Sequence, residues 1–569
     1  MVRIAAALVL PLFACADDSG GQSDEASSSS SSTSPTTTSP TATSVEPTTT
    51  TTADSSEGST AAASSSESSS GGEVTLLERV ALALGGAEEL AALDGFVLTA
   101  EGTTRNADEG ATPDDTIVDG SAFAIDLSVD VANAGWRLDH ERTITFAGLG
   151  LPMQYSEIIS GEIGAIDGVD NLFGAPGGAM PSDRWGAIVR RQQLLHPQLL
   201  VIAALADPGI ATDLGPADLD GVAHDRLAIT SEVAELVLWI DPATDLPVRL
   251  TTLENNWLRR DVELQLDYDG WAASDGGVLF AAGATLAIDG EVLHEETRSA
   301  ISTTAELAPA LFEIPPEATS TLDEAAAARG RMNHSLLLEF QGVGIPAWGF
   351  QVQVAPVVLA PAATHLTGGT HHSVIVEQAN GLVLLETPLY EARCQALLDW
   401  AATEYPGKSV THAVVSHYHV DHSGCARTLV ARGATLVVGE GSDVVWTEVL
   451  AAPSTIDPDE LSANPVAPTI EYVPDGGSFV IDDASAAVTV FDLPNSHSSD
   501  MVLPFVESAG LVFVADLFNP GTPAQLSPDG AQSLLDAFEL YGITGQVDAI
   551  AAAHGFGTAT VADLQDAVP

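Results

Sequence analysis

A cluster of metal-capable side chains in the segment SHYHVDHSG, residues 416–424, constrains the fold of this chain more than any other feature. The candidate ligands in it are His417, His419, Asp421 and His422. The segment before it, THAVVS, has the apolar pattern of a short buried strand, and the segment after it, GCARTLVARG, has the pattern of a helix. In α/β proteins, functional groups lie on such strand-to-helix loops. We therefore predict a metal site at the edge of an α/β sheet.

Three more metal-capable residues follow apolar strand patterns later in the chain. His497 comes after AVTVFDLP, Asp516 after GLVFVA and His554 after VDAIAAA. Strand ends on one edge of a sheet converge, so these residues are expected to share a site with the first cluster. Imidazole and carboxylate groups are zinc ligands, and a zinc ion normally takes four ligands at about 2.0–2.2 Å.

Seven ligands are more than one zinc ion needs, so we predict two ions with a hydroxide between them, on the order of 3.5–4 Å apart. The expected division is His417, His419 and His497 at the first ion, Asp421, His422 and His554 at the second, and Asp516 as a bridge. The alternative is a structural metal site or an enzyme that has lost activity. Structural zinc sites are usually rich in cysteine, and this set contains none.

The pattern H-x-H-x-D-H at 417–422, followed in order by His497, Asp516 and His554, resembles the metallo-β-lactamase superfamily. The segment SVIVEQANGLVLLET, residues 373–387, adds to the resemblance, because its Asn380-Gly381 pair predicts a hairpin like the one that opens the family's fold. The resemblance covers about residues 340–569. It implies an αββα sandwich, in which two mixed sheets lie face to face, helices lie outside and the metals lie at one edge.

The resemblance also suggests roles for residues around the ligands. Glu386 stands where the family often has an aspartate that orients a ligand histidine. Asp500 is a candidate for orienting His497, with helix capping as the alternative. His371 is a candidate for lining the substrate pocket, with an exposed loop position as the alternative.

The ligand types narrow the choice of metal and subgroup. No cysteine occupies a late ligand position, which is unlike the cysteine-ligated antibiotic-resistance enzymes and similar to the thioesterase, lactonase and phosphodiesterase branches. His419 stands where the di-iron, oxygen-reducing relatives have a glutamate. Two zinc ions are therefore favoured as the cofactors, with iron or manganese as alternatives.

The first 72 residues predict export and tethering. Residues 1–14 carry Arg3 and a short apolar run, which is typical of a signal peptide. The segment LFAC resembles a bacterial lipobox, in which Cys15 is lipidated; the competing interpretation is an ordinary cleavage site at ACA, residues 14–16, and secretion. Residues 15–72 are mostly Ser, Thr, Gly, Ala, Pro and acidic residues, so they predict a disordered tether. We expect a lipid anchor on the bacterial cell envelope, at the periplasmic face of the outer membrane or at the cell surface.

The remaining chain predicts a multidomain protein with two ordered parts. Residues 73–322 contain short alternating apolar runs separated by turn signals, which predict a β-rich domain with one helical stretch at 182–206. This domain weakly resembles the half-barrel of periplasmic lipoprotein-carrier proteins. Residues 322–332 predict a helix at the boundary, and residues 335–569 form the metallo-β-lactamase-like α/β domain.

The charge balance restricts the partners. Lys+Arg is 19 and Asp+Glu is 79, giving a formal net charge of −60. Such a surface repels nucleic acid and anionic membranes. We expect a small-molecule substrate, contact with a membrane only through the lipid anchor, and no nucleic acid.

Two cysteines remain if Cys15 is lipidated. Cys394 lies in the helical pattern YEARCQALLDWAA. Cys425 begins the helix that follows residues 416–424, which we call the metal loop. In an oxidising compartment an even pair favours a disulfide. Two buried thiols are the alternative.

These features predict a metallo-hydrolase acting on an ester, lactone, thioester or phosphoester. Asp421 is the expected catalytic residue, which binds metal and orients the hydroxide. The competing hypothesis is a tethered lipid- or metabolite-binding lipoprotein, in which the β-rich domain binds the ligand and the metal domain is not catalytic.

Overall fold

The computed structural model describes residues 74–146, 149–171, 176–339, 352–522 and 529–568. By compactness the chain divides into Met1–Gly71 and Gly72–Pro569, and the described residues belong to the second unit. The predicted signal peptide, Cys15 and most of the predicted tether lie outside the described residues. Within the described part, every helix is too short or too polar to cross a membrane.

The described chain begins with two short helices, α1 (Leu76–Ala83) and α2 (Ala87–Ala91). Thr75 and Glu78 form a capping box at the start of α1. Between the helices, Gly85 and Gly86 have φ angles of 126° and 119°, which a side chain would strain. The Gly-Gly pair therefore sets the turn.

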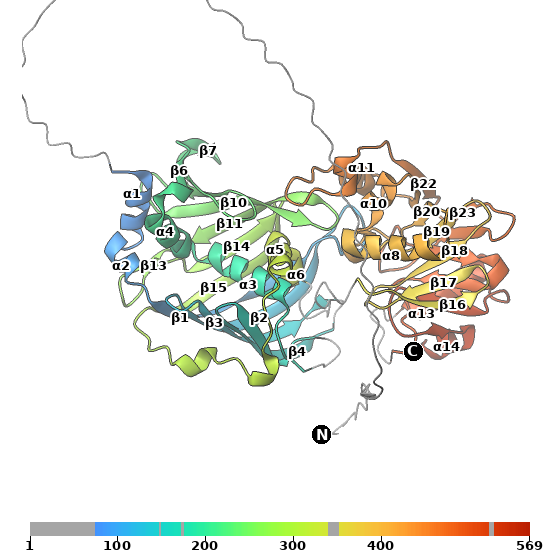
Figure 1. Cartoon of the computed structure of the whole chain (residues 1–569), viewed down its shortest axis with the longest axis horizontal. Coiled ribbons are helices and arrows are strands. Elements are labelled where there is room, and N and C mark those ends of the chain that lie inside the picture. The colour runs from blue at the N-terminus through green and yellow to red at the C-terminus, as the bar shows by residue number, and fades with distance from the viewer. Residues whose placement is uncertain (1–73, 147–148, 172–175, 340–351, 523–528, 569) are drawn as a thin grey trace, which may run out of the picture. The chain divides into compact units, whose positions relative to one another are not determined.

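The β-rich domain is built on one large antiparallel sheet (Figure 1), with strand order β5-β4-β3-β2-β1-β15-β14-β11-β10-β9-β8-β6, and β7 pairs with β8. Its strands are β1 (Gly95–Asn106), β2 (Val118–Asp130), β3 (Gly135–Ile144), β4 (Leu151–Ser160), β5 (Ile163–Val169), β6 (Ala211–Asp213), β7 (Ala217–Leu219), β8 (Val222–Ile229), β9 (Leu236–Ile240), β10 (Pro247–Asn256), β11 (Arg260–Asp269), β14 (Gly283–Ile288) and β15 (Glu291–Ser302). A separate pair consists of β12 (Ala272–Ala273) and β13 (Leu279–Phe280). The β-rich prediction is confirmed, and the half-barrel resemblance stays a prediction.

The helical stretch predicted at 182–206 is confirmed and consists of two consecutive helices. They are α3 (Ser182–Leu195) and α4 (Pro197–Ala206), with His196 between them at φ −124° and ψ 78°. Proline lacks an N–H and disfavours helical geometry in the residue before it, so Pro197 ends one helix and begins the next. Both helices bury apolar residues against the sheet.

Two further helices follow the β-rich sheet. They are α5 (Glu324–Met332) and α6 (His334–Glu339). Asp323 caps α5 by accepting hydrogen bonds from the backbone of Ala325 and Ala326. Both helices pack against α3 (Figure 1).

The C-terminal domain contains two sheets. The first, in the order β16 to β22, is antiparallel from β16 to β19 and parallel from β19 to β22. Its strands are β16 (Ala355–Ala360), β17 (Ala363–Thr367), β18 (Ser373–Glu377), β19 (Leu382–Leu385), β20 (Val410–Val414), β21 (Thr435–Gly439) and β22 (Thr469–Val473). The predicted hairpin is β18–β19, with Glu377 paired to Leu382 across the turn that holds Asn380-Gly381.

The second sheet has the order β23 to β28, with β26 and β27 parallel. Its strands are β23 (Ser478–Ile481), β24 (Val488–Asp492), β25 (Val502–Val506), β26 (Leu511–Val514), β27 (Ala549–Ala552) and β28 (Thr558–Ala559). The α-helices among the described residues of the domain are α8 (Glu391–Glu404), α9 (Val420–Ser423), α10 (Ala426–Ala431), α11 (Asp443–Ala451), α12 (Glu460–Ala463), α13 (Gly530–Leu540) and α14 (Val561–Asp566).

Three apolar cores hold these layers together. Val376, Val414, Val488 and Phe513 belong to a core between the two sheets. A second core joins the first sheet to α8, α10 and α11, and a third joins the second sheet to α13 and α14. The layers are therefore helix, sheet, sheet, helix, as expected of an αββα sandwich.

Candidate metal centre

The first group of candidate ligands is His417, His419, His497 and Asp516, whose ligand atoms all lie within 4.8 Å of one another. His417 and His419 follow β20, His497 lies between β24 and β25, and Asp516 follows β26. Asp516 Oδ2 lies 3.2 Å from His417 Nε2 and 2.9 Å from His497 Nε2. Two ligands about 2.1 Å from one zinc ion at a tetrahedral angle lie roughly 3.4 Å apart. The spacing therefore suits a common cation.

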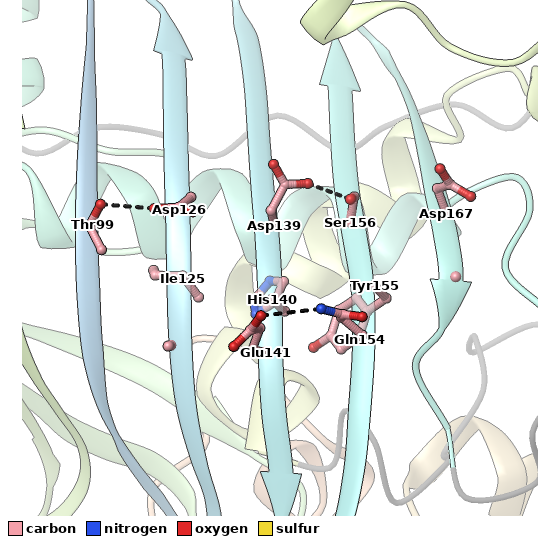
Figure 2. A pocket seen from close by; sticks show the side chains of 12 residues that line it. Thr99, Ile125, Asp126, Asp139, His140, Glu141, Gln154, Tyr155, Ser156 and Asp167 are labelled. Carbon is pink, nitrogen blue, oxygen red and sulfur yellow. Dashed lines mark hydrogen bonds between the residues drawn. The ribbon is translucent and has the colours of Figure 1, made fainter.

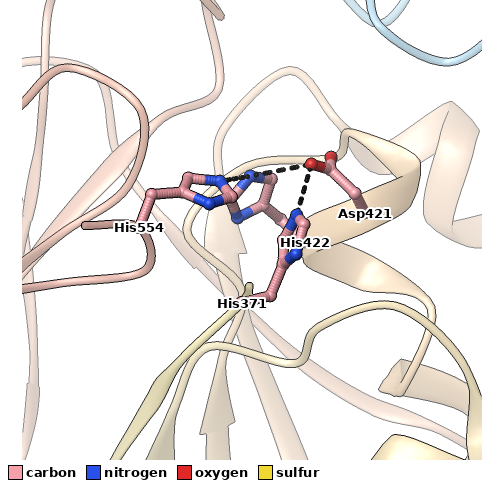
Figure 3. Close-up of side chains that lie close together, drawn as sticks. All are labelled: His371, Asp421, His422 and His554. Atoms are coloured by element: carbon pink, nitrogen blue, oxygen red, sulfur yellow. Dashed lines mark hydrogen bonds and ion pairs between the residues drawn. The ribbon is translucent and has the colours of Figure 1, made fainter. Parts of the chain in front are cut away.

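The second group is His371, Asp421, His422 and His554, which converge from three places in the chain (Figure 3). His422 Nε2 and His554 Nε2 are 3.3 Å apart. Asp421 Oδ2 lies 3.4 Å from His422 Nε2. These separations again suit two ligands of one ion.

Asp516 lies between the two groups. Its Oδ2 is 3.1 Å from His422 Nε2, and its Oδ1 is 2.9 Å from His554 Nε2. It therefore contacts members of both groups, as a bridging carboxylate must. The residue has φ 54° and lies two positions after the end of β26.

The structure brings together all seven residues that the sequence proposed as ligands and adds His371. His371 Nε2 lies 2.7 Å from Asp421 Oδ2, and His371 Nδ1 lies 2.8 Å from the Thr370 hydroxyl. The 2.7 Å separation of His371 Nε2 and Asp421 Oδ2 is that of a hydrogen bond. His371 is buried at the centre and orients Asp421, so the exposed-loop alternative was wrong.

Outer hydrogen bonds fix how the histidines face the centre. His419 donates from Nε2 to the Gly110 carbonyl at 2.8 Å, and His554 donates from Nδ1 to the Thr370 carbonyl at 3.0 Å. His422 donates from Nδ1 to Glu386 Oε2 at 3.2 Å, so glutamate reaches its partner despite the extra methylene. Because a carbonyl only accepts, the other ring nitrogens of His419 and His554 keep their lone pairs for a cation.

Several polar atoms that face the centre are buried and make no aligned hydrogen bond, although some of them lie at ion-pair distance from another candidate ligand. They are His417 Nε2, His419 Nδ1, His497 Nε2, Asp421 Oδ1 and Asp516 Oδ1. Buried polar atoms are rarely left unsatisfied, because their desolvation costs about 1–3 kcal/mol each. Nitrogen and carboxylate donors in this arrangement are the ligand set that zinc takes, so the residues fit a pair of divalent cations.

The pKa values of His417 and His419 suit metal binding at neutral pH. Burial, with the positive charge of His422, lowers the pKa of His417 to about 4. Burial also lowers the pKa of His419 well below its ordinary value. For His422, burial acts to lower the pKa, but the charges of Asp421, Asp516 and Glu386 outweigh it and hold the pKa well above the ordinary value. His417 and His419 are therefore neutral and ready to coordinate near pH 7.

Two residues at the centre come from the β-rich domain and were missed by the sequence. Gly110 accepts the hydrogen bond from His419, and Glu109 Oε2 lies 3.6 Å from His419 Nδ1. Both lie between β1 and β2 in the segment NADEGATPDD, which has no strand-end ligand pattern. No signal in the sequence relates this turn to a loop three hundred residues later.

For Asp500 the helix-capping alternative was wrong, and the role of orienting His497 stays a prediction. Its Oδ1 accepts a hydrogen bond from the Ser498 hydroxyl at 2.7 Å, and it precedes β25 rather than a helix. Asn495 shapes the loop, because its Oδ1 accepts from the backbone N–H groups of His497 and Ser498. This Asx-type turn was not foreseen from the sequence NSHSSD.

Cys394 and Cys425 form a disulfide, with their Cα atoms 5.3 Å apart. The bond joins α8 to the residue before α10, directly after the metal loop. The alternative of two buried thiols is thus not what the structure shows.

Residues 366–542 match the family model described as the metallo-beta-lactamase superfamily. The match spans both groups except His554. Together with the layers described above, it assigns the metallo-β-lactamase fold to the C-terminal domain and confirms that prediction. A search of curated proteins finds no match.

Several solved structures align with the chain at low similarity. A metallo-beta-lactamase from Pontibacter korlensis has 16% identity and a TM-score of 0.30, covering 38% of this chain and 97% of its own. The metallo-beta-lactamase FIM-1 from Pseudomonas aeruginosa, in its mono-zinc form, has 16% identity and a TM-score of 0.29, covering 40% and 96%. The stereoselective inverting sec-alkylsulfatase Pisa1 from Pseudomonas sp. has 17% identity and a TM-score of 0.29, covering 38% and 42%. Alignments with such low identities and TM-scores give no information about the substrate of this protein.

Proposed function

We propose that this protein is a metal-dependent hydrolase that uses two zinc ions on an ester, lactone, thioester or phosphoester. The observation that supports it most is the convergence of the two ligand groups on Asp516, with inward-facing polar atoms that make no aligned hydrogen bond. Divalent cations, when bound in such a pair, lower the pKa of water and polarise the substrate oxygen. Iron or manganese stays an alternative to zinc.

The protein's own residues then position and orient the reactants. His417, His419 and His497 would hold one cation, and Asp421, His422 and His554 the other, with Asp516 between them. His371 donates to Asp421 Oδ2, while Asp421 Oδ1 has no partner. That free acceptor oxygen can take a hydrogen bond from the attacking water and align it, which is the basis for keeping Asp421 as the catalytic residue.

The test is hydrolysis by the metal-replete protein across substrate classes. The panel contains a nitrophenyl ester, a lactone, a thioester, a phosphodiester and an alkyl sulfate. We expect turnover of at least one neutral ester, lactone or thioester, loss of it on chelation and recovery with zinc. Activity that persists after complete metal removal, or metal-loaded protein inactive on every class, would contradict the proposal.

We propose further that the enzyme is displayed on the bacterial cell envelope through Cys15 and the Ser/Thr-rich tether, and acts on small molecules rather than nucleic acid. The support is the sequence pattern of residues 1–72 and the net charge of −60. Labelling cells with a fatty-acid probe tests this. We expect the wild-type protein to be labelled and to stay with the cells, and the Cys15→Ser variant to be unlabelled and released into the medium. Equal release of both proteins would favour secretion.

The competing carrier function finds no specific support. A hollow of about 490 Å³ on strands β1 to β5 is lined by polar and acidic side chains, among them Asp126, Asp139 and Asp167 (Figure 2). A second hollow, which shares His140 and Tyr155 with the first, has about 80 Å³, well below the roughly 300–1,000 Å³ of ordinary ligand pockets. The second hollow has apolar lining residues, among them Phe123, Leu138 and Leu195, but it is too small for a lipid chain.

A further inference from the structure

The loop between β1 and β2 of the β-rich domain is bonded to the metal loop. Tyr418 donates from its hydroxyl to the Gly110 carbonyl at 2.7 Å, and His419 Nε2 donates to the same oxygen. The Val420 N–H donates to the Asp108 carbonyl at 3.1 Å, and the Ser499 N–H donates to the Ala111 carbonyl at 2.9 Å. Successive residues of one domain are thus held against the ligand loops of the other.

The shape of this loop is fixed by its own residues. Asp108 has φ 57°, and its buried carboxylate accepts from Arg259 Nε at 2.7 Å. A Cβ at Gly110 would lie 1.7 Å from the Asp115 carbonyl oxygen, so only glycine fits. Because Asp108 and Gly110 are both fixed, Glu109 between them has little freedom.

Glu109 reaches both ligand groups. Its side chain is 4% exposed, and its Oε2 lies 3.6 Å from His419 Nδ1, the ring nitrogen left free for a cation. Its Oε1 is buried without a hydrogen-bond partner. Its side chain also lies close to Asp421 and Asp516. The carboxylate therefore faces His419 of the first group and Asp421 of the second.

The distance from Glu109 Oε2 to His419 Nδ1 is close to the roughly 3.4 Å between two ligands of one zinc ion. We propose that Glu109 is an additional metal-binding carboxylate of this centre, so that the β-rich domain and the metallo-β-lactamase domain build one active site. The inference rests on the proposed metal dependence.

The experiment compares wild type with Glu109→Gln and with Asp114→Asn, an exposed carboxylate on the same loop, all in the full chain. Metal-free protein is titrated with zinc against a chromogenic chelator. Wild type and Asp114→Asn are each expected to bind two zinc ions, and the affinities of the two proteins are expected to be the same. Glu109→Gln is expected to bind at least one ion at least about tenfold more weakly, and its cobalt-substituted form to have a changed visible spectrum.

Hydrogen exchange supplies a second readout that does not depend on the variant folding. In wild type, zinc is expected to slow exchange of amides in the 107–117 loop relative to metal-free protein. In Glu109→Gln the protection is expected to shrink. Unchanged exchange of this loop in zinc-loaded wild type would overturn the inference.

The outcomes separate this inference from the proposed function. If wild type binds two ions, and Glu109→Gln binds them with wild-type affinity and an unchanged cobalt spectrum, Glu109 is not a ligand and only the inference fails. If wild type binds no metal, the proposed function fails as well.

Discussion

At the scale of single residues, Asp421 is the group on which the proposed chemistry depends most. His371 donates to one of its oxygens, and the other is buried without a partner. We expect Asp421→Asn to lower kcat by at least about 100-fold, because an amide is a poorer ligand and offers one acceptor oxygen instead of two.

Steady-state kinetics on metal-loaded protein check this prediction, with folding followed by circular dichroism. Asp482→Asn, an exposed carboxylate in the same domain, is the control and should keep wild-type turnover. Wild-type kcat in metal-loaded Asp421→Asn would end the assignment of Asp421.

The residues that could be predicted are those with a local signature. The ligand histidines and aspartates each follow an apolar strand pattern, so their convergence could be inferred from how strand ends meet. Glu109 does not follow an apolar strand pattern, and its position near the ligands depends on the packing of one domain on another. The turn that the Asn495 side chain forms was missed because Asn, Asp and Ser side chains can hydrogen-bond to nearby backbone groups in several different ways.

At the scale of elements, the contact between the metal loop and the segment after β19 is unusually close. A Cβ at Gly424 would lie 1.5 Å from the Leu389 carbonyl oxygen. Thr387 also donates from its hydroxyl to the His422 carbonyl at 2.9 Å. We expect Gly424→Ala to push the two loops apart, lowering the free energy of unfolding by about 1–3 kcal/mol and weakening zinc binding.

Urea unfolding and zinc competition measure these two effects. Gly545→Ala is a matched control in the same domain, because no heavy atom lies within 4 Å of the Cβ it would add. The prediction is wrong if Gly424→Ala and Gly545→Ala behave alike.

The disulfide gives a second prediction at this scale. Cys394 and Cys425 are 31 positions apart, and the loop between them contains β20 and most of the metal loop. Closing such a loop restricts the unfolded chain, so the double variant Cys394→Ala/Cys425→Ala should lose about 2–4 kcal/mol of unfolding free energy. Denaturant titrations should show that reductant destabilises wild type but leaves the double variant unchanged; equal stability of both proteins would refute a stabilising disulfide.

Helices and strands were predictable where their pattern is local. The hairpin β18–β19 and the boundary helix α5 follow directly from turn and helix signals. The break between α3 and α4 depends on one residue, Pro197, which interrupts an otherwise helical pattern. The order of the strands in the large sheet could not be derived, because long-range pairing leaves no periodic signal.

At the scale of the whole molecule, buried neutral histidines couple stability to pH. His365 donates from Nε2 to the Ala552 carbonyl at 3.1 Å, and burial lowers its pKa to about 4. An unfolded histidine titrates near 6.5. Between these values the unfolded chain binds the extra proton, so this group makes the folded state less stable as pH falls from about 6.5 toward 4.

We expect His365→Asn to have a shallower fall in unfolding free energy than wild type between pH 6.5 and 4.5, by up to about 1.4 kcal/mol per pH unit. Urea unfolding of the two metal-free proteins measures the slopes. Other groups, such as Asp500, whose pKa burial raises to about 6, cancel in the comparison. Identical slopes would show that His365 does not titrate differently on folding.

Diffraction from crystals of the zinc-loaded protein at the zinc absorption edge tests most directly whether these side chains hold a pair of ions. We predict two anomalous peaks on the order of 3.5–4 Å apart, one among His417, His419 and His497 and one among Asp421, His422 and His554, with Asp516 in contact with both. A single peak, or peaks away from these side chains, would contradict a dinuclear centre.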